Sequence, residues 1–315
     1  MLLNQNQKNR SIVHEMILYD VGEKMRKKLL ELKNLTKYYG KIKGIEDLTL
    51  TLYEGEVFGF IGPNGAGKST TIRIIMNSIF PTSGTVLFDE IKLDPDHIET
   101  KKMIGYLPSE IHLYGDFTVK QMLDYHASFY QQDCSKRRKE LVQRFAVDET
   151  KKIEELSLGN LKKVGNVLAF MHEPKLLILD EPTSGLDPVM QQRFYELIHE
   201  EKKKGTTIFY STHILSEISK VCDRVGFVKN GKLLKVETME EMQKKRFTFV
   251  KISSPEREKI IEAFHLKTYQ EEDGMLKFKN QFPIDQLLQI LSQYHIDQLL
   301  IEEATLEEML LEAYL

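Results

Sequence analysis

The chain has 315 residues, 41% hydrophobic and 29% charged, a composition ordinary for a soluble globular protein with one large and one small domain. Its formal net charge of −3 excludes a global basic field directed at nucleic acid, and its two distant cysteines exclude a disulfide scaffold or a zinc cluster and suit a reducing cytosol. No apolar run approaches the roughly 20 residues that span a bilayer, so any membrane spans must come from another chain.

Residues 1–28 lack the periodicity of the following sequence, and MLLNQNQKNR lacks the order of a secretory signal. We expect an N-terminal extension that is unstructured or belongs to a mis-assigned start. The dipeptide Gly22-Glu23 can be encoded as GGAGAA, a purine run similar to a bacterial ribosome-binding site, just before Met25. The sequence therefore predicts that the working protein starts at Met25 and lacks residues 1–24.

Residues 29–243 have the pattern of an α/β domain. Alternating strands are predicted in KKLLELKNLTKYYG and in IEDLTLTLYEGE, where Leu48, Leu50 and Leu52 share one face. The apolar run VFGFIG (57–62) predicts a buried parallel strand, which leads through PNGAGKST into a helix over TIRIIMNSIF (71–80).

The second half of this domain repeats the alternation. Residues 117–172 are mostly helical in pattern, LLILDE (176–181) and TIFYST (207–212) predict further buried strands, and RVGFVKNGKLLKV (224–236) predicts a hairpin with Asn-Gly at its turn. The basic runs SKRRKE and EEKKKG are mixed with acidic residues, so we expect them on solvated helix faces.

After residue 243 the pattern of predicted strands and helices changes, and residues 244–315 are predicted to be a small α+β domain. Strands are expected in FTFVKIS, KTYQ, MLKFKN and DQLLIEEA, with helices in PEREKIIEAFHL and PIDQLLQILSQY. This β-α-β-β-α-β order is typical of a ferredoxin-like domain.

The segment GPNGAGKS matches the phosphate-loop pattern G-x-x-x-x-G-K-[ST] between a buried strand and an amphipathic helix. Glycines let the backbone amides approach phosphates, the following helix presents its positive end, and Lys68 can bridge the β- and γ-phosphates. Ser69 can ligate Mg²⁺, and Thr70 can add a hydroxyl group. The predicted nucleotide-binding residues here are Gly62, Pro63, Asn64, Gly65, Ala66, Gly67, Lys68, Ser69 and Thr70.

A second candidate group follows the strand LLILD. Asp180 and Glu181 stand at the strand end, where α/β sheets place ligand chemistry. Asp180 can hold Mg²⁺ through water, and Glu181 can polarise a water for attack on the γ-phosphorus. The alternative is a solvated turn, which the phosphate loop upstream disfavours.

In their order, these motifs resemble the nucleotide-binding subunit of an ABC transporter over about residues 29–243. GPNGAGKST resembles the Walker A loop and LLILDE resembles Walker B. The resemblance implies a P-loop ABC-type ATPase domain with a helical subdomain, and ATP and Mg²⁺ as its cofactors.

Further motifs extend the resemblance. SGLD (184–187) is similar to the D-loop and marks Asp187, STH (211–213) marks His213 as the γ-phosphate contact, and KYYG marks Tyr39 as the aromatic residue that stacks on adenine. The resemblance thus implies Glu181, His213 and Lys68 as catalytic residues.

LSLGN (156–160) stands where the family has its signature LSGGQ, which closes over the nucleotide of the opposite subunit. Ser157 and Gly159 are kept, Asn160 is one methylene shorter than Gln, and Leu158 replaces a glycine, which requires negative φ or strain. We interpret it as a working variant rather than a degenerate signature, because Ser157 and Glu181 are both present.

The Q-loop segment GYLPSE carries Ser109 where the family has Gln. Serine is too short to reach Mg²⁺ directly, so a bridging water, or Glu110 reaching inward, must replace the amide if Ser109 belongs to the metal site.

The wording of residues 55–73 and the ending LEEMLLEAYL resemble exporter ATPases of the drug- and bacteriocin-resistance kind. This implies a separate transmembrane permease, a second ATPase subunit (the same chain or another), and a position at the cytoplasmic face of the cell membrane, with no nucleic acid. A cytosolic ABC ATPase without a permease, or a non-hydrolysing regulatory module, are the alternatives.

Overall fold

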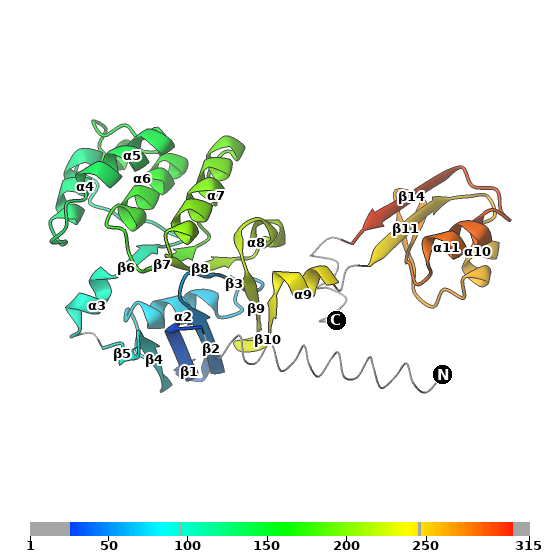
Figure 1. The fold of residues 1–315 in the computed structure, drawn as a ribbon, viewed down its shortest axis with the longest axis horizontal. Helices are drawn as coiled ribbons and strands as arrows, with labels where there is room; N and C mark the ends of the chain where they lie inside the picture. Colours follow the sequence, from blue (N-terminus) through cyan, green and yellow to red (C-terminus); the bar gives the residue numbers. More distant parts are fainter. Residues whose placement is uncertain (1–25, 95, 245–246, 305–315) are drawn as a thin grey trace. The chain divides into compact units, whose positions relative to one another are not determined.

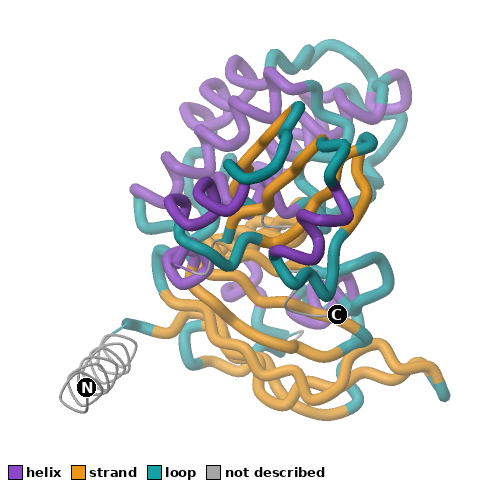
Figure 2. Tube along the Cα trace, turned by 90° about the vertical axis from the view of Figure 1, so that its right-hand side faces the viewer, coloured by secondary structure: helices purple, strands orange, loops and turns teal. Residues whose placement is uncertain are grey.

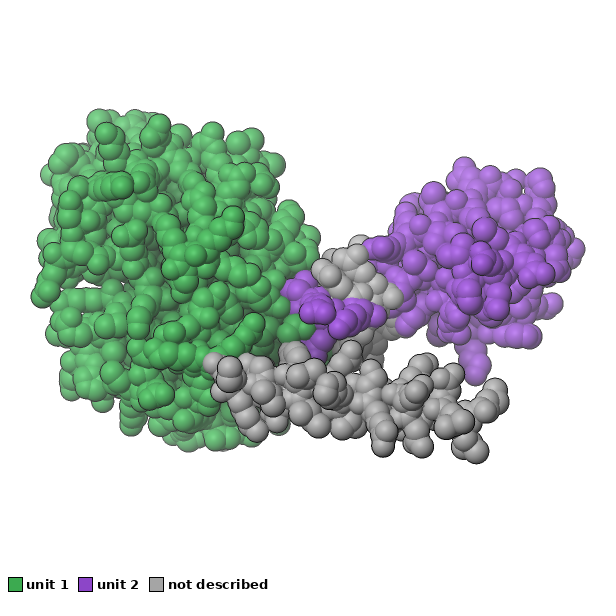
Figure 3. Space-filling view, in the orientation of Figure 1, with its two compact units in different colours: residues 1–238 green, residues 239–315 purple. Residues whose placement is uncertain are grey.

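The computed structural model describes residues 26–94, 96–244 and 247–304. They fall into two compact units divided between Thr238 and Met239 (Figure 3). The sequence placed this division after residue 243, but α9 (Met239–Lys244) clusters with the second unit. The prediction for residues 1–24 and the resemblance of residues 306–315 lie outside the described residues.

Two sheets build the first unit (Figures 1 and 2). One is antiparallel, in the order β2-β1-β4-β5; the other has the order β10-β9-β3-β8-β7-β6 and is parallel except for β10. The strands are β1 (Lys28–Tyr39), β2 (Ile42–Tyr53), β3 (Val57–Ile61), β4 (Ser83–Phe88), β5 (Ile91–Lys92), β6 (Ile104–Leu107), β7 (Leu176–Asp180), β8 (Thr207–Thr212), β9 (Arg224–Lys229) and β10 (Lys232–Thr238).

The strands follow the hydrophobic patterns of the sequence. All residues of β3 and β7 are buried, as expected for parallel strands covered on both faces. Leu48, Leu50 and Leu52 are all buried on β2, which confirms their predicted common face. The hairpin β9–β10 turns at Asn230 and Gly231, whose φ values of 52° and 77° are those of the predicted Asn-Gly turn.

The helix after the phosphate loop, α2 (Lys68–Ile75), is shorter than predicted. The chain leaves the helix after Met76, and Asn77 takes a left-handed φ of 53°. Ile74 is buried as well as Ile72 and Ile75, because α2 shares one core with strands of both sheets. A helix packed on two sides does not show a single apolar face.

In chain order, the helices of the first unit after α2 are α3 (Ile98–Lys102), α4 (Val119–Ala127), α5 (Ser135–Phe145), the 3-10 turn η1 (Ile153–Glu155), α6 (Leu158–Phe170), α7 (Pro188–Lys203) and α8 (Leu215–Val221). The segment predicted to be helical, residues 117–172, contains α4, α5 and α6, which lie together in Figure 1. The other helices of the first unit lie before and after this segment. The prediction that SKRRKE and EEKKKG lie on solvated faces is wrong for Arg137 and for Glu201, which are both buried. Tertiary packing buries the two together, and Arg137 forms an ion pair with Glu201 of α7.

The second unit contains one antiparallel sheet in the order β12-β13-β11-β14. Its described elements after α9 are β11 (Thr248–Ser253), α10 (Arg257–Ala263), β12 (Gln270–Glu272), β13 (Met275–Lys279), α11 (Ile284–Leu291) and β14 (Gln298–Glu303). Strands and helices share a core that includes Val250, Ile260, Phe278 and Leu287. Within the described parts of the chain, no helix is long and apolar enough to cross a membrane.

Candidate nucleotide-binding site

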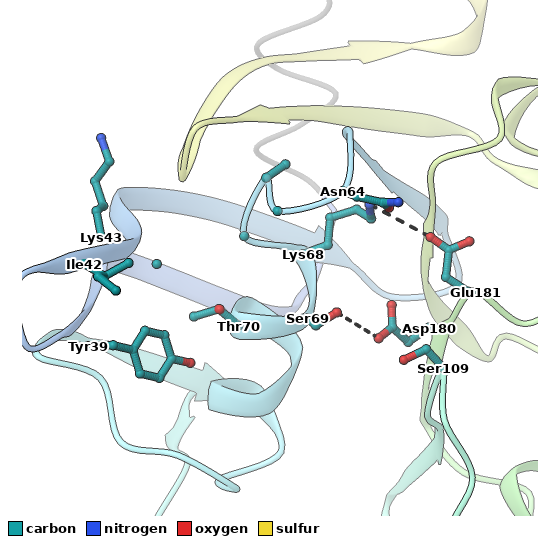
Figure 4. Close-up of a pocket in the computed structure, with 14 residues that line it drawn as sticks. Tyr39, Ile42, Lys43, Asn64, Lys68, Ser69, Thr70, Ser109, Asp180 and Glu181 are labelled. Atoms are coloured by element: carbon teal, nitrogen blue, oxygen red, sulfur yellow. Dashed lines mark hydrogen bonds and ion pairs between the residues drawn. The ribbon is translucent and has the colours of Figure 1, made fainter.

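A cleft of about 430 Å³ lies at the carboxyl ends of β3 and β7 (Figure 4). It brings together the phosphate loop, the carboxylates after β7, the loop after β6 and the end of β1. The lining residues are Tyr39, Ile42, Lys43, Gly44, Asn64, Gly65, Ala66, Gly67, Lys68, Ser69, Thr70, Ser109, Asp180 and Glu181. Ile42, Lys43 and Gly44 were missed from the sequence, because they belong to a strand rather than to a motif.

The phosphate loop needs its glycines for two different reasons. Gly67 has a φ of 108°, which L-residues rarely adopt. A Cβ on Gly62 would lie 2.2 Å from the carbonyl oxygen of Val228, so only glycine fits against β9. The loop leads into α2, which begins at Lys68. Lys68, Ser69 and Thr70 line the cleft, so the first-turn amides, which have no partner within the helix, lie beside it.

Lys68 is buried at the floor of the loop. Its ammonium group donates to the carbonyl oxygens of Gly62 (2.6 Å) and Pro63 (3.3 Å) and lies 3.9 Å from Glu181 Oε1 (Figure 4). Burial lowers the pKa of Lys68, while the charges of Glu181 and Asp180 oppose this shift. The side chain thus places a cation between the loop and the carboxylates.

Asp180 and Ser69 form the oxygen-rich part of the cleft. Ser69 Oγ donates to Asp180 Oδ2 over 3.3 Å. Burial raises the pKa of Asp180, and its Oδ1 has no hydrogen-bond partner within the described residues. A buried carboxylate oxygen without a partner beside a hydroxyl group fits a hard divalent cation such as Mg²⁺, which prefers oxygen ligands.

Glu181, which lines the cleft, pairs with His213, which does not. Glu181 has a left-handed φ of 48°, held by the hydrogen bond from its amide to the carbonyl oxygen of Ser211 (2.9 Å). Its Oε1 lies 2.9 Å from His213 Nδ1. His213 therefore helps to fix the position of a carboxylate that lines the cleft.

The buried carboxylate of Glu217, which the sequence did not indicate, stabilises the segments that carry Glu181 and His213. Glu217 of α8 accepts hydrogen bonds from Thr212 Oγ1 (2.9 Å), Tyr210 OH (3.1 Å) and Thr183 Oγ1. Thr212 directly precedes His213, and Thr183 belongs to the turn after Glu181. A single glutamate on a short helix carries no sequence signal for such a role, because acidic residues on helices are usually solvated.

The signature segment begins α6 without strain. Ser157 is the N-cap and accepts a hydrogen bond from the Asn160 amide (3.4 Å), and Leu158 is the first helical residue, outside the positive-φ region. The isobutyl group of Leu158 is exposed (66%). A Cβ on Gly159 would lie 2.6 Å from the Gly185 carbonyl oxygen, so this glycine is required by the turn packed against it.

Not all of the predicted site residues lie together. The predicted residues that do not line the cleft of their own chain are Gly62, Pro63, Ser157, Gly159, Asp187 and His213. Asp187 instead caps α7, where its side chain accepts a hydrogen bond from the Met190 amide (2.9 Å).

Ser109 lines the cleft, but the neighbouring Glu110 does not reach inward. The Glu110 side chain is 88% exposed and lies 3.8 Å from His112. The carbonyl oxygens of Pro108 and Ser109 instead accept hydrogen bonds from the buried Lys162 of α6. Lys162 is a second residue that sequence reasoning missed, since a lysine on a helix is usually exposed.

Comparison with known proteins gives the same assignment. Residues 45–184 match the family described as ABC transporter. The ABC transporter ATP-binding protein YtrB of Bacillus subtilis is 36% identical over 216 residues, which are 68% of this chain and 74% of that protein. The chain belongs to the ABC transporter ATP-binding family. It is therefore an ATPase that binds and hydrolyses ATP for transport.

Two further relatives are informative. The bacitracin transport ATP-binding protein BcrA of Bacillus licheniformis is 32% identical over 257 residues, which are 79% of this chain and 84% of that protein. A dimeric ATP-binding cassette in a post-hydrolysis state, bound to ADP and phosphate, has a TM-score of 0.61 at 26% identity, over 67% of this chain and 99% of that one. The P-loop fold of an ABC ATPase and its nucleotide are thus shared.

Proposed function

We propose that this chain hydrolyses ATP at the interface of two ATPase subunits and thereby powers an exporter whose permease is a separate chain. The observation that carries the proposal is the meeting of Lys68, Asp180 and Glu181 in one cleft beside the phosphate loop. The names of two relatives support export rather than import. They are the bacitracin transport protein BcrA and the linearmycin resistance ATP-binding protein LnrL of Bacillus subtilis, which is 32% identical over 219 residues.

Each residue of the cleft then has a role set by its position. Lys68 binds the β- and γ-phosphates, the amides of residues 62–70 bind the phosphate oxygens, and Tyr39 stacks on the base. Glu181 takes a proton from the attacking water, and His213 holds Glu181 and contacts the γ-phosphate.

Mg²⁺ is the cofactor that the oxygen donors fit. When bound, it neutralises charge that develops on the phosphates. Ser69 and Asp180 would hold it, and Ser109 would act only through water. Within the described residues no group of three or more His, Cys, Asp or Glu could hold a metal ion, so the remaining ligands would be phosphate and water oxygens, as is usual for this ion.

The second ATPase subunit completes the site. Ser157, Gly159 and Asp187 lie outside the cleft of their own chain, and a dimeric relative supports their use in the site of a partner. Apolar side chains are exposed on the same segments: Leu158 beside Ser157, Val189 two residues after Asp187, and Ile214 after His213. Such side chains favour burial against a second subunit.

A permease would contact the helical part of the first unit. Tyr114, after the Ser109 loop, forms an exposed aromatic cluster with Tyr125 of α4 and with Phe129. The ring centroids of Tyr114 and Tyr125 are 5.9 Å apart, and those of Tyr125 and Phe129 are 4.9 Å apart. Aromatic clusters of this kind favour protein partners. The chain would then work at the cytoplasmic face of the cell membrane, where the permease holds it. We expect no nucleic-acid partner.

We also propose that a small ferredoxin-like domain, residues 244–315, follows an ATPase domain over residues 29–243. Its elements begin with β11, so α9 of the second unit does not belong to this topology. Its order of elements, β11-α10-β12-β13-α11-β14, and its strand order support this topology. It would be an accessory domain without residues in the nucleotide cleft.

Glu181→Gln tests the catalytic assignment. The amide has nearly the same shape but cannot take a proton, so we expect turnover to fall at least about 100-fold, within the range for loss of general base catalysis. Binding of ATP, measured by equilibrium titration, should stay within about twofold, because Glu181 lies beyond the phosphate loop.

Glu173→Gln, a change in an exposed acidic residue outside the cleft, is the matched control and should not alter either quantity. Hydrolysis by Glu181→Gln at a rate close to that of the unaltered protein would show that another group activates the water.

A further inference from the structure

Lys162 is a buried cation with a specific set of partners. It lies on α6, five residues after the signature Ser157, and only 2% of its surface is exposed. Its ammonium group donates to the carbonyl oxygens of Pro108 (3.1 Å) and Ser109 (3.3 Å). A lysine is almost never buried without such partners, so these bonds connect α6 to the loop that carries Ser109 into the cleft.

Helix α6 also packs closely against this loop at Gly165. A Cβ on Gly165 would lie 2.4 Å from Ile111 Cδ1 and 2.8 Å from Leu107 Cδ1. Glycine at residue 165 therefore lets α6 approach the segment 107–111 more closely than any other residue would. Lys162 and Gly165 together fix the loop to the signature helix.

The charge of Lys162 also interacts with the two carboxylates of the nucleotide site. Burial lowers its pKa to about 8, while the charges of Asp180 and Glu181 raise it. The ammonium group is thus buried within reach of the field of the two carboxylates, although it does not line the cleft. Loss of this charge would leave two loop carbonyls without their donor.

We propose that Lys162 is a positioning residue that ties the Ser109 loop to the signature helix, so that the two segments move as one body. The catalytic consequence rests on the roles proposed above for Ser157 and the cleft. Contact of the signature with the nucleotide of a partner would then be transmitted by α6 to the cleft of the same chain. Lys162 itself touches neither nucleotide.

Amide hydrogen exchange of the full chain without nucleotide tests the tie independently of hydrolysis. In Lys162→Met we expect exchange at the amides of residues 109–112 to accelerate at least about tenfold, because local opening no longer breaks the two hydrogen bonds from Lys162. Exchange in β3 and β7 should be unchanged. Lys163→Met, which removes a charge from the adjacent, less buried position on α6, should leave the loop protected.

Gly165→Ala supplies a second route to the same result if Lys162→Met does not fold, since its methyl group displaces Ile111 while Lys162 stays in place. It should raise exchange in the same loop. Unchanged loop exchange in the folded variants, or equal acceleration throughout the first unit, would overturn the proposal.

Steady-state ATP hydrolysis tests the catalytic consequence. Lys162→Met should lower kcat about tenfold, as expected for a loop displaced by a fraction of an ångström, and change KM for ATP by less than about twofold. Lys162→Arg, which retains the charge and donors, should recover part of kcat. A loosened loop with unchanged kcat would refute the positioning role, while the Glu181→Gln result would still stand on its own.

Discussion

Two adjacent tyrosines show how the surroundings of a residue decide its role. Tyr39 lines the cleft with its ring half exposed, whereas the hydroxyl group of Tyr38 donates to Glu46 over 3.0 Å. Tyr39→Ala should weaken binding of ATP by about 1–3 kcal/mol, the range for stacking of a base on an aromatic ring. GTP should lose a similar amount, because stacking contacts the face of any purine.

Tyr38→Ala is the control for this change, and titration with both nucleotides is the measurement. Its effect on affinity should stay below the effect of Tyr39→Ala for each nucleotide. The assignment fails if Tyr39→Ala binds ATP normally or if Tyr38→Ala has the larger effect.

At the residue scale, sequence reasoning succeeded where chemistry and spacing occur together. Lys68, Ser69, Asp180 and Glu181 belong to contiguous motifs, and the structure brings them into one cleft. Lys162 and Glu217 were missed, because their roles depend on burial by distant segments. A charged residue on a helix has the same local sequence pattern whether tertiary packing buries it or leaves it in water.

At the scale of elements, the helical group contains a buried histidine that should make stability depend on pH. His172 follows α6 and stacks on Tyr130, with ring centroids 4.2 Å apart. Burial lowers the pKa of His172 from 6.5 to about 4. Below pH 6.5 the unfolded chain therefore binds a proton that the folded chain binds only near pH 4.

The contribution of His172 to stability is therefore complete above pH 6.5, falls as the pH decreases towards 4, and then stays constant. The full loss is about 3 kcal/mol at 1.36 kcal/mol per unit. His172→Phe retains a ring for Tyr130 but cannot titrate, so between pH 7.5 and 4 it should lose about 3 kcal/mol less stability than the unaltered protein. Denaturant unfolding at both pH values measures this difference, and parallel losses would contradict the assignment.

Two boundary errors at this scale have local causes. The strand expected in KTYQ lies instead at Gln270–Glu272, because the turn at Asp273 and Gly274, with φ values of 53° and 76°, pairs Glu272 with Met275. The Asp-Gly signal was present in the sequence but was not used to set the register. The early end of α2 had no comparable signal, since the apolar pattern continues to Phe80.

At the scale of the whole molecule, the second unit has the components of an independent domain. Its core residues come only from its own strands and helices. We predict that a fragment of residues 247–315 unfolds cooperatively on heating, although with low stability because so small a core is marginal. A fragment of residues 25–244 should bind ATP like the full chain.

Calorimetry of the first fragment and nucleotide titration of the second are the measurements. A non-cooperative profile for residues 247–315, or loss of ATP binding by residues 25–244, would show that each unit depends on the other.

Fold class and the principal motifs could be predicted because they depend on periodicity and on contiguous residues. The proposed use of Ser157 by a partner cannot be derived from the structure of one chain, in which Ser157 lies outside the cleft of its own subunit. This shared site is the central claim, and mixing two inactive variants tests it directly.

Lys68→Ala spoils the phosphate loop, and Ser157→Arg blocks the signature with bulk and charge. Ser157→Arg also removes the cap of α6, at a cost of about 1 kcal/mol, so Ser157→Thr, which retains the hydroxyl cap, is its control. Each variant alone should be nearly inactive. A mixed dimer of the two combines both lesions in one site and leaves the other site intact.

The measurement is the ATPase activity of the mixture, with formation of mixed dimers shown by differently tagged chains. The account predicts that activity returns on mixing. If the two sites act independently, a mixed dimer should reach about half the rate of the unaltered dimer, and an equal mixture with random pairing about a quarter. Mixed dimers without activity, or full activity of Ser157→Arg alone, would contradict a signature that serves the nucleotide of its partner.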